Sequence, residues 1–169
     1  AGFILTGVVA GEAGIADVLF YLAVYTIQLV AAFAVVAAVS GATGVRSALS
    51  EYSGLAERQP FMAATFSVIL LGMGGLPLTS GFMAKFGVFT GAWAAGYEWL
   101  VIVGLVAGVV ALFLYLRVIV IMFMDDPAEA EVHTPAPTRW VLGVVAAVTI
   151  LFGILPGPLL DLASRALPL

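Results

Sequence analysis

Four long apolar stretches constrain the fold of this chain more than any other feature of its sequence. A helix that crosses a bilayer needs about 20 mainly apolar residues, and each of these stretches is long enough. Hydrophobic residues make up 63% of the chain and charged residues only 9%, against about 25% charged residues in soluble domains. We therefore expect an all-α, polytopic transmembrane helix bundle that is embedded in a lipid bilayer, with spans at Val18–Val39, Phe61–Ala95, Trp99–Met124 and Trp140–Leu160.

The first residues form a fifth apolar segment that is too short to cross a membrane. Ala1–Gly11 has no initiator Met and no basic region of the kind that opens a signal peptide. We expect this segment to be the end of a truncated helix, and the chain to be a fragment of a longer subunit.

The composition excludes several kinds of site. Without cysteine the chain has no disulfides, no thiolate metal ligands and no iron–sulfur ligation, and its one histidine, His133, cannot build a haem or zinc site alone. That histidine lies in an acidic, proline-rich loop, which is typical of a solvated connection. The net charge is −4 and there is no basic patch for nucleic acid. We expect no cofactor or metal in this chain and no nucleic-acid partner.

The second span is too long to be one straight helix. Its 35 residues would extend about 52 Å at 1.5 Å per residue, against a hydrocarbon core of about 30 Å. The run Gly72–Gly81 offers a break, because Pro77 removes a backbone donor and glycines lower helix propensity. We predict two half-helices. Freed carbonyls at membrane depth require polar surroundings, and Thr79 and Ser80 supply hydroxyls to this hydrated break.

Lys85 is the only lysine and the only charge between Arg58 and Glu98. An ammonium at the bilayer centre costs about 2.5–3.5 kcal/mol on insertion scales, so a lysine kept there is a functional candidate. It follows Pro77 by eight residues, and helical side chains lean towards the N-terminus, so we expect it to point at the break. Gly81, one turn earlier, would leave room for water. Because desolvation favours the neutral amine, Lys85 could act as a proton relay.

Two polar side chains have alternative interpretations. Lys85 could instead extend to the outer interface, where Trp93, Tyr97 and Trp99 resemble an aromatic belt. Gln28, in the first long span, could belong to a hydrated relay or could bond a neighbouring helix as polar glue. The sequence leaves both alternatives open for Gln28.

Other polar and small residues in the spans indicate anchoring and packing. Arg117 lies eight residues before Asp125 and can reach the interface, so we expect an anchor. Gly104 and Gly108 form a GxxxG pattern that permits close helix contact, and Tyr115 is expected to pack. Between the first two long spans, the spacing of apolar residues in Ser40–Pro60 predicts a short amphipathic helix at the membrane surface, with an apolar face of Val45, Leu49, Tyr52 and Leu55.

Two segments carry a resemblance to a known family. Leu70–Phe86, around the predicted break, and Leu114–Met124 resemble subunit N of bacterial NADH-quinone oxidoreductase, respiratory complex I. The resemblance covers the whole chain, including the connector Glu51–Leu55, and implies the C-terminal third of that subunit.

The resemblance implies an antiporter-like fold, in which inverted repeats each contain a discontinuous helix. Lys85 would then be the lysine of the terminal proton half-channel, exchanging protons with a central axis of lysines and one glutamate upstream of Ala1. The implied partners are other membrane subunits of complex I in a bacterial plasma membrane. FMN, iron–sulfur clusters, NADH and a quinone would be used by other subunits.

Two alternative functions share these features. A subunit of a sodium/proton antiporter complex would have the same fold, and fold alone does not decide function. A structural membrane scaffold would use Lys85 only as an anchor. The residues of Pro77–Phe86 and Leu114–Met124 favour complex I.

The distribution of arginine predicts the orientation, because cytoplasmic loops are enriched in basic residues. Arg46 and Arg58 lie in the loop after the first long span, and Arg117 and Arg139 flank the loop Asp125–Thr138. Both loops should face the cytoplasm, and the poorly basic segments Gly96–Glu98 and Glu12–Asp17 should lie outside with the tail.

We predict that reagents outside sealed membranes do not reach either loop. Single cysteines at Ser50 and Thr138, in an otherwise cysteine-free protein, should react with an impermeant maleimide only after the membrane is opened. Labelling of either position from the outer side would reverse the assignment.

Overall fold

A computed structural model of the chain describes residues 2–43, 48–128, 132, 135–158 and 161, and these residues contain helices and connections but no strand. The 3-10 helices are η1 (Gly11–Gly14) and η2 (Leu49–Tyr52). The α-helices are α1 (Gly2–Val8), α2 (Ile15–Thr43), α3 (Leu55–Arg58), α4 (Pro60–Gly74), α5 (Ser80–Ala94), α6 (Glu98–Met124) and α7 (Ala136–Ile154).

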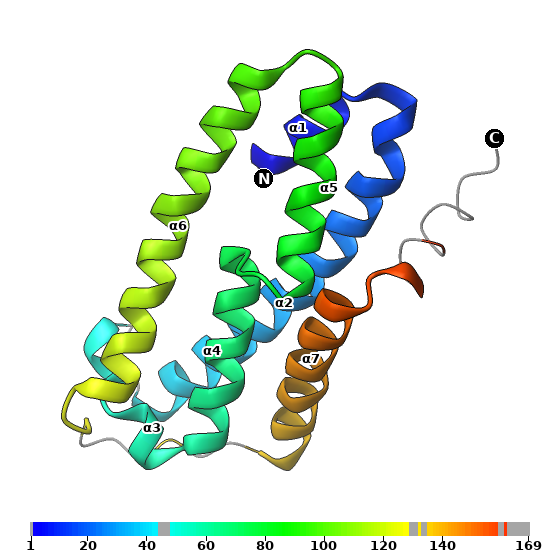
Figure 1. Cartoon of the computed structure of the whole chain (residues 1–169). Helices are drawn as coiled ribbons and strands as arrows, with labels where there is room; N and C mark the ends of the chain where they lie inside the picture. The colour runs from blue at the N-terminus through cyan, green and yellow to red at the C-terminus, as the bar shows by residue number, and fades with distance from the viewer. Residues whose placement is uncertain (1, 44–47, 129–131, 133–134, 159–160, 162–169) are drawn as a thin grey trace.

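The half-helices α4 and α5 form the centre of the bundle, one above the other in Figure 1. The long helix α6 lies along one side of them, and α2 packs against both. Helix α7 packs on α4 and reaches the start of α5, while α1 packs on the far half of α5. One end of the bundle therefore holds the starts of α4 and α7, and the opposite end holds α1 and the end of α5.

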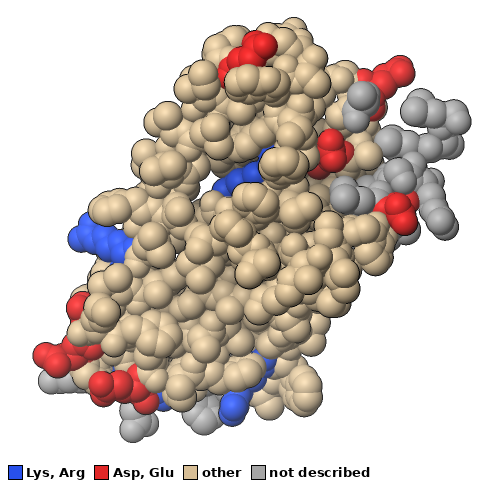
Figure 2. All heavy atoms as spheres, viewed as in Figure 1, with Lys and Arg blue, Asp and Glu red and all other residues tan. Residues whose placement is uncertain are grey.

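Among the described residues, three helices are long and apolar enough to cross a membrane: α2 over Ile15–Ser40, α6 and α7. The half-helices have 15 residues each, which is about 22 Å and less than a hydrocarbon core of about 30 Å. In Figure 2, much of the surface formed by α4, α6 and α7 carries no charged side chain. The prediction of an all-α membrane bundle is confirmed.

The predicted break lies at Gly75–Thr79, between α4 and α5. Gly75 has φ of 83°, in the left-handed region that favours glycine. Its N–H donates to the Gly72 carbonyl, and the Leu76 N–H donates to the Leu71 carbonyl, a Schellman motif that satisfies carbonyls of the last turn. Pro77 follows at once and cannot continue a helix.

Gly81 has a packing role that the sequence did not indicate. A Cβ atom built at Gly81 would overlap the carbonyl oxygen of Gly72. The missing side chain therefore lets the start of α5 cross the end of α4 at backbone contact. Gly81 also lines a cavity of about 10 Å³ that Lys85 borders, so the expectation that it leaves room for water there stays a prediction.

The connector after α2 also differs from the expected single surface helix. Helix α2 continues to Thr43, and the chain then forms η2 and the one-turn helix α3. Tyr52 and Leu55 are buried as predicted, but Leu49 is 44% exposed, and Val45 lies outside the described residues. The left-handed conformation of Gly54, φ 58°, separates the two turns.

The last long helix is shifted from the predicted Trp140–Leu160. It begins at Ala136 with Pro137 in its first turn, where proline is tolerated because the N–H would have no partner there. It ends at Ile154, because the residue before Pro156 is restricted to extended backbone. Leu155 accordingly has φ −124° and ψ 73°.

The loops after α2 and after α6 lie together at one end of the bundle. The Gly54 N–H donates to the Ile121 carbonyl at 3.2 Å, the Ala128 N–H donates to the Ser53 carbonyl at 3.2 Å, and Gln59 Nε2 donates to the Val132 carbonyl at 2.8 Å. Their common side agrees with the arginine distribution. That this side is cytoplasmic stays a prediction, and Arg46 is outside the described residues.

The small and polar residues of α6 have varied surroundings. A Cβ at Gly104 would lie 2.8 Å from a ring carbon of Phe89, so the glycine makes room for an aromatic ring and not for a second helix backbone. Tyr115 packs against the hydrophobic core, as expected. Arg117 is exposed, as suits an anchor.

We predict that Gly81→Ala destabilises the protein, because the new methyl group must push apart two half-helices that touch through their backbones. Overpacking typically costs about 1–3 kcal/mol, and a clash with backbone is at the upper end. Gly108→Ala is the matched control, since its Cβ would find only Phe3 at 3.8 Å. Thermal unfolding in detergent should show a lower midpoint for Gly81→Ala alone; equal midpoints would contradict this role.

Candidate functional site

Lys85 closes the break between α4 and α5 with its side chain. Its Nζ donates to the carbonyls of Met73 and Gly74, at 2.8 Å each. The usual helical partner of the Met73 carbonyl would be the N–H of residue 77, which is Pro77 and has none. The proline therefore creates an acceptor that the lysine then satisfies, as the predicted orientation towards the break requires.

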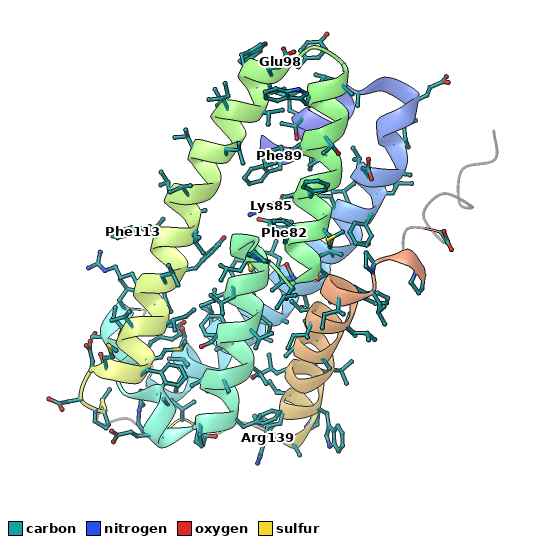
Figure 3. All side chains as sticks on the ribbon, viewed as in Figure 1. Phe82, Lys85, Phe89, Glu98, Phe113 and Arg139 are labelled. Atoms are coloured by element: carbon teal, nitrogen blue, oxygen red, sulfur yellow. The ribbon has the colours of Figure 1, made fainter. Side chains whose placement is uncertain are left out.

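A third contact completes the surroundings of the ammonium. Nζ lies 4.9 Å from the centre of the Phe3 ring, over its face. Carbonyl oxygens and an aromatic face all carry partial negative charge, and a cation over such a ring gains about 0.5–2 kcal/mol. In Figure 3, Lys85 leaves α5 towards the end of α4, on the side that faces α6. The contacts match a protonated amine.

The alternative of an interfacial lysine does not match this geometry. Trp93, Tyr97 and Trp99 are 56%, 40% and 63% exposed around the turn from α5 to α6. Lys85 extends the other way along α5, to the last residues of α4.

Gln28 links three helices beside the break. It is 2% exposed, and its Nε2 donates to Ser80 Oγ on α5 at 3.3 Å and to Thr149 Oγ1 on α7 at 3.4 Å. Within the described part of the chain, no hydrogen bond joins Gln28 to Lys85. These bonds join helices as polar glue does, and because Gln28 also lines a small cavity with Lys85, a part in a relay stays a prediction. Sequence reasoning missed Thr149 as a partner of Gln28. A threonine within an otherwise apolar span was a signal that could have found it.

The two hydroxyls of the break are used differently. Thr79 is the N-cap of α5: its Oγ1 accepts from the Phe82 N–H at 3.3 Å and donates to the Leu76 carbonyl at 2.6 Å. Such a cap satisfies a backbone donor that has no helical partner. Ser80 accepts from Gln28. The structure thus brings Ser80 and Gln28 together. The Thr79 hydroxyl instead bonds backbone groups only three residues away along the chain.

Lys85 lies between two cavities. The smaller has a volume of about 10 Å³ and is lined by Tyr21, Tyr25, Gln28 and Lys85, with backbone of the break; this is room for about one water. The Tyr21 hydroxyl is buried without a hydrogen-bond partner in the described structure. The second cavity, about 240 Å³, lies between α5 and α6 and is lined mainly by aromatic and aliphatic side chains.

One acidic side chain that packs on α5 was not singled out from the sequence. We had placed Asp17 in an outer loop, but it belongs to the first turn of α2. A Cβ built at Gly87 would lie 2.7 Å from Asp17 Oδ1, so this carboxylate packs on α5 two residues beyond Lys85. The long-range contact with α5 could not be read from local spacing. No group of three or more potential metal ligands gathers within the described ranges.

Comparison with known proteins supports one family. Residues 1–111 match the model of the family described as NADH:quinone oxidoreductase/Mrp antiporter, transmembrane. The chain is 48% identical over 170 residues to NADH-quinone oxidoreductase subunit N 3 of Streptomyces griseus, covering 98% of this chain and 31% of that protein. It is 43% identical to subunit N of Salinispora arenicola, covering 98% and 33%. The chain therefore spans about a third of the length of these relatives.

Solved structures give the same result. A chain of respiratory complex I from Thermus thermophilus with bound aureothin superposes with a TM-score of 0.82 at 26% identity, over 94% of this chain and 36% of that one. A chain of the Mrp complex from Dietzia sp. has a TM-score of 0.83 at 23% identity, over 97% and 39%, which shows the shared fold alone. With the family model matching residues 1–111 of 169, the chain belongs to the NADH:quinone oxidoreductase/Mrp antiporter transmembrane family.

Proposed function

We propose that this chain is part of the proton-translocating membrane subunit of a bacterial respiratory complex I, and that Lys85 is its proton relay. The observation that carries the proposal is the position of the Lys85 ammonium on two carbonyls of a broken membrane helix. The partners would be other membrane subunits of the complex in the bacterial plasma membrane. FMN, iron–sulfur clusters, NADH and quinone would belong to other subunits.

The contacts of Lys85 distinguish its two protonation states. Two N–H groups are enough to bond the carbonyls of Met73 and Gly74, and a neutral amine also has two. Its lone pair would then face the electron-rich ring of Phe3, whereas the third N–H of an ammonium is attracted to that ring. The site favours the charged form by this third contact, and the proton leaves when a second positive charge approaches.

The smaller cavity supplies one side of a proton path. Buried hydroxyls almost always have a hydrogen-bond partner, protein or water, and the Tyr21 hydroxyl has none among the described residues. A water in the cavity that Tyr21 and Lys85 both line would satisfy the hydroxyl. The lysine stem is flexible, so Nζ can turn between this cavity and the carbonyls.

Sequence identity favours complex I over a sodium/proton antiporter. The relatives at 43–48% identity are named NADH-quinone oxidoreductase subunit N, while the likeness to an Mrp complex at 23% identity concerns the fold.

Asp17 is a candidate for a second group on the proton path. Its contact with α5 places it on the side of the path that faces the end of α5.

We predict that Lys85→Ala and Lys85→Met, in the intact complex, depress proton pumping and quinone-linked NADH oxidation by about tenfold or more, since positioned acid–base groups typically contribute about 10²–10⁴-fold. Assembly should be largely retained. Lys85→Arg should rescue poorly, because guanidinium stays protonated where a relay must release its proton. Proton uptake and NADH oxidation are measured in sealed vesicles and normalised to assembled complex.

Arg117→Gln is the control for Lys85, because it removes an exposed cation from a neighbouring apolar helix. It should leave both rates unchanged. Full activity in Lys85→Ala would exclude the relay. Good rescue by arginine, with loss of assembly in the alanine variant, would instead support the scaffold alternative.

We also predict that Tyr21→Phe lowers proton pumping several-fold without loss of assembly, because it removes the hydroxyl that would hold water beside Lys85. Removing a hydroxyl that is merely unsatisfied in the core should be neutral or stabilising. The control is Tyr115→Phe, outside the lining of that cavity. If Tyr21→Phe pumps protons normally and is more stable, the cavity lined by Tyr21 and Lys85 is not part of the proton path.

A further inference from the structure

A wide apolar groove lies between α4 and α7, away from Lys85. Its volume is about 580 Å³, within the range of about 300–1,000 Å³ that is common for ligand sites. One wall is Phe61 at the start of α4, and the other is a stripe along α7 that runs from Ala136 to Ala147 through Trp140, Gly143 and Val144. A Cβ atom built at Gly143 would lie 3.2 Å from the Phe61 ring, so the glycine leaves the space between the two walls open.

The length of the groove corresponds to one leaflet of a bilayer. From Ala136 to Ala147, α7 rises about 16 Å at 1.5 Å per residue, and half of a hydrocarbon core is about 15 Å. Because the candidate membrane span α7 begins at Ala136, we place the start of the groove at the interface and its other end near the bilayer centre. An extended acyl chain has this shape and this position.

The interfacial end of the groove is positively charged. Among the described residues that line it, Arg139 is the one that carries a charge, and its guanidinium lies 5.5 Å from the centre of the Phe61 ring. No carboxylate in the described part of the chain pairs with this arginine. Figure 3 shows Arg139 at the end of the bundle where α4 and α7 begin.

Two helix starts add to this positive end. Helices α4 and α7 both begin here, and neither receives a side-chain cap. Their N-terminal ends carry partial positive charge and backbone N–H groups without helical partners. Trp140, 76% exposed, lies next to Arg139, and tryptophan prefers the level of lipid headgroups.

We propose that this groove is a binding site for an anionic phospholipid, with one acyl chain along the α7 stripe and the phosphate at Arg139. The charge of the site complements an anionic headgroup and gives a zwitterionic one less attraction. The inference is independent of the proton path, because none of the residues that line the groove contacts Lys85.

The experiment uses photoactivatable phosphatidylglycerol and phosphatidylcholine, each with a diazirine in one acyl chain, added to the intact complex in bilayers. After illumination, adducts are mapped by mass spectrometry. Phosphatidylglycerol should label the peptide of Trp140–Ala147 about fivefold more than phosphatidylcholine, the factor that one basic residue contributes at an anionic surface, about 1 kcal/mol.

Two variants separate headgroup recognition from acyl binding. Arg139→Gln should make the two lipids label α7 equally, whereas the matched control Arg117→Gln, on α6, should leave the preference intact. Ala147→Phe should fill the groove and reduce labelling of α7 by both lipids, while adducts on α6 stay.

Three results would overturn the proposal. Equal labelling by the two lipids in the unchanged protein would mean ordinary annular lipid. A preference that survives Arg139→Gln would remove the arginine from recognition. Absence of α7 adducts, with cross-links to a neighbouring protein instead, would mean that a subunit covers the groove.

Discussion

A backbone carbonyl without a donor is costly inside a membrane, and this requirement governs the centre of the structure. Each unsatisfied group costs several kcal/mol in hydrocarbon, so a broken helix needs a built-in source of donors. Pro77 removes the donor that the Met73 carbonyl would use, and Lys85 supplies one from the next half-helix. The break and the lysine therefore depend on one another: the carbonyls need donors, and a charge in the membrane needs acceptors.

The rest of the bundle holds the carbonyls of the break and the Lys85 amine in position. Gly81 brings the two half-helices to backbone contact, and Gln28 ties α2 to Ser80 and Thr149. Thr79 caps α5 through its own side chain. These contacts satisfy hydrogen-bonding groups around the break within the protein, and Lys85 lies between two cavities.

Lys85 and Arg139 lie at different levels of the helix bundle and have different surroundings. Lys85 is at the middle, where α4 gives way to α5, and its neighbours are carbonyls and an aromatic ring. Arg139 is at the end of the bundle, over Phe61 and beside exposed Trp140. The first arrangement suits a proton, which needs partners inside the membrane, and the second suits a lipid headgroup, which stays at the interface.

The sequence by itself determined the membrane class, the broken helix and the direction of Lys85, because hydrophobic length, proline chemistry and the lean of helical side chains are local properties. It also identified Gln28 and Ser80 as polar groups, yet it left open whether Gln28 was relay or glue. Only the tertiary structure showed that Gln28 bonds Ser80 and Thr149, since Thr149 is 121 residues away along the chain. The contact of Gly81 with Gly72, the position of Asp17 on α5 and the groove beside Arg139 likewise depend on how separate helices pack. Spacing along one helix predicts which face a residue occupies, but the neighbour that meets this face is set by packing of the whole bundle.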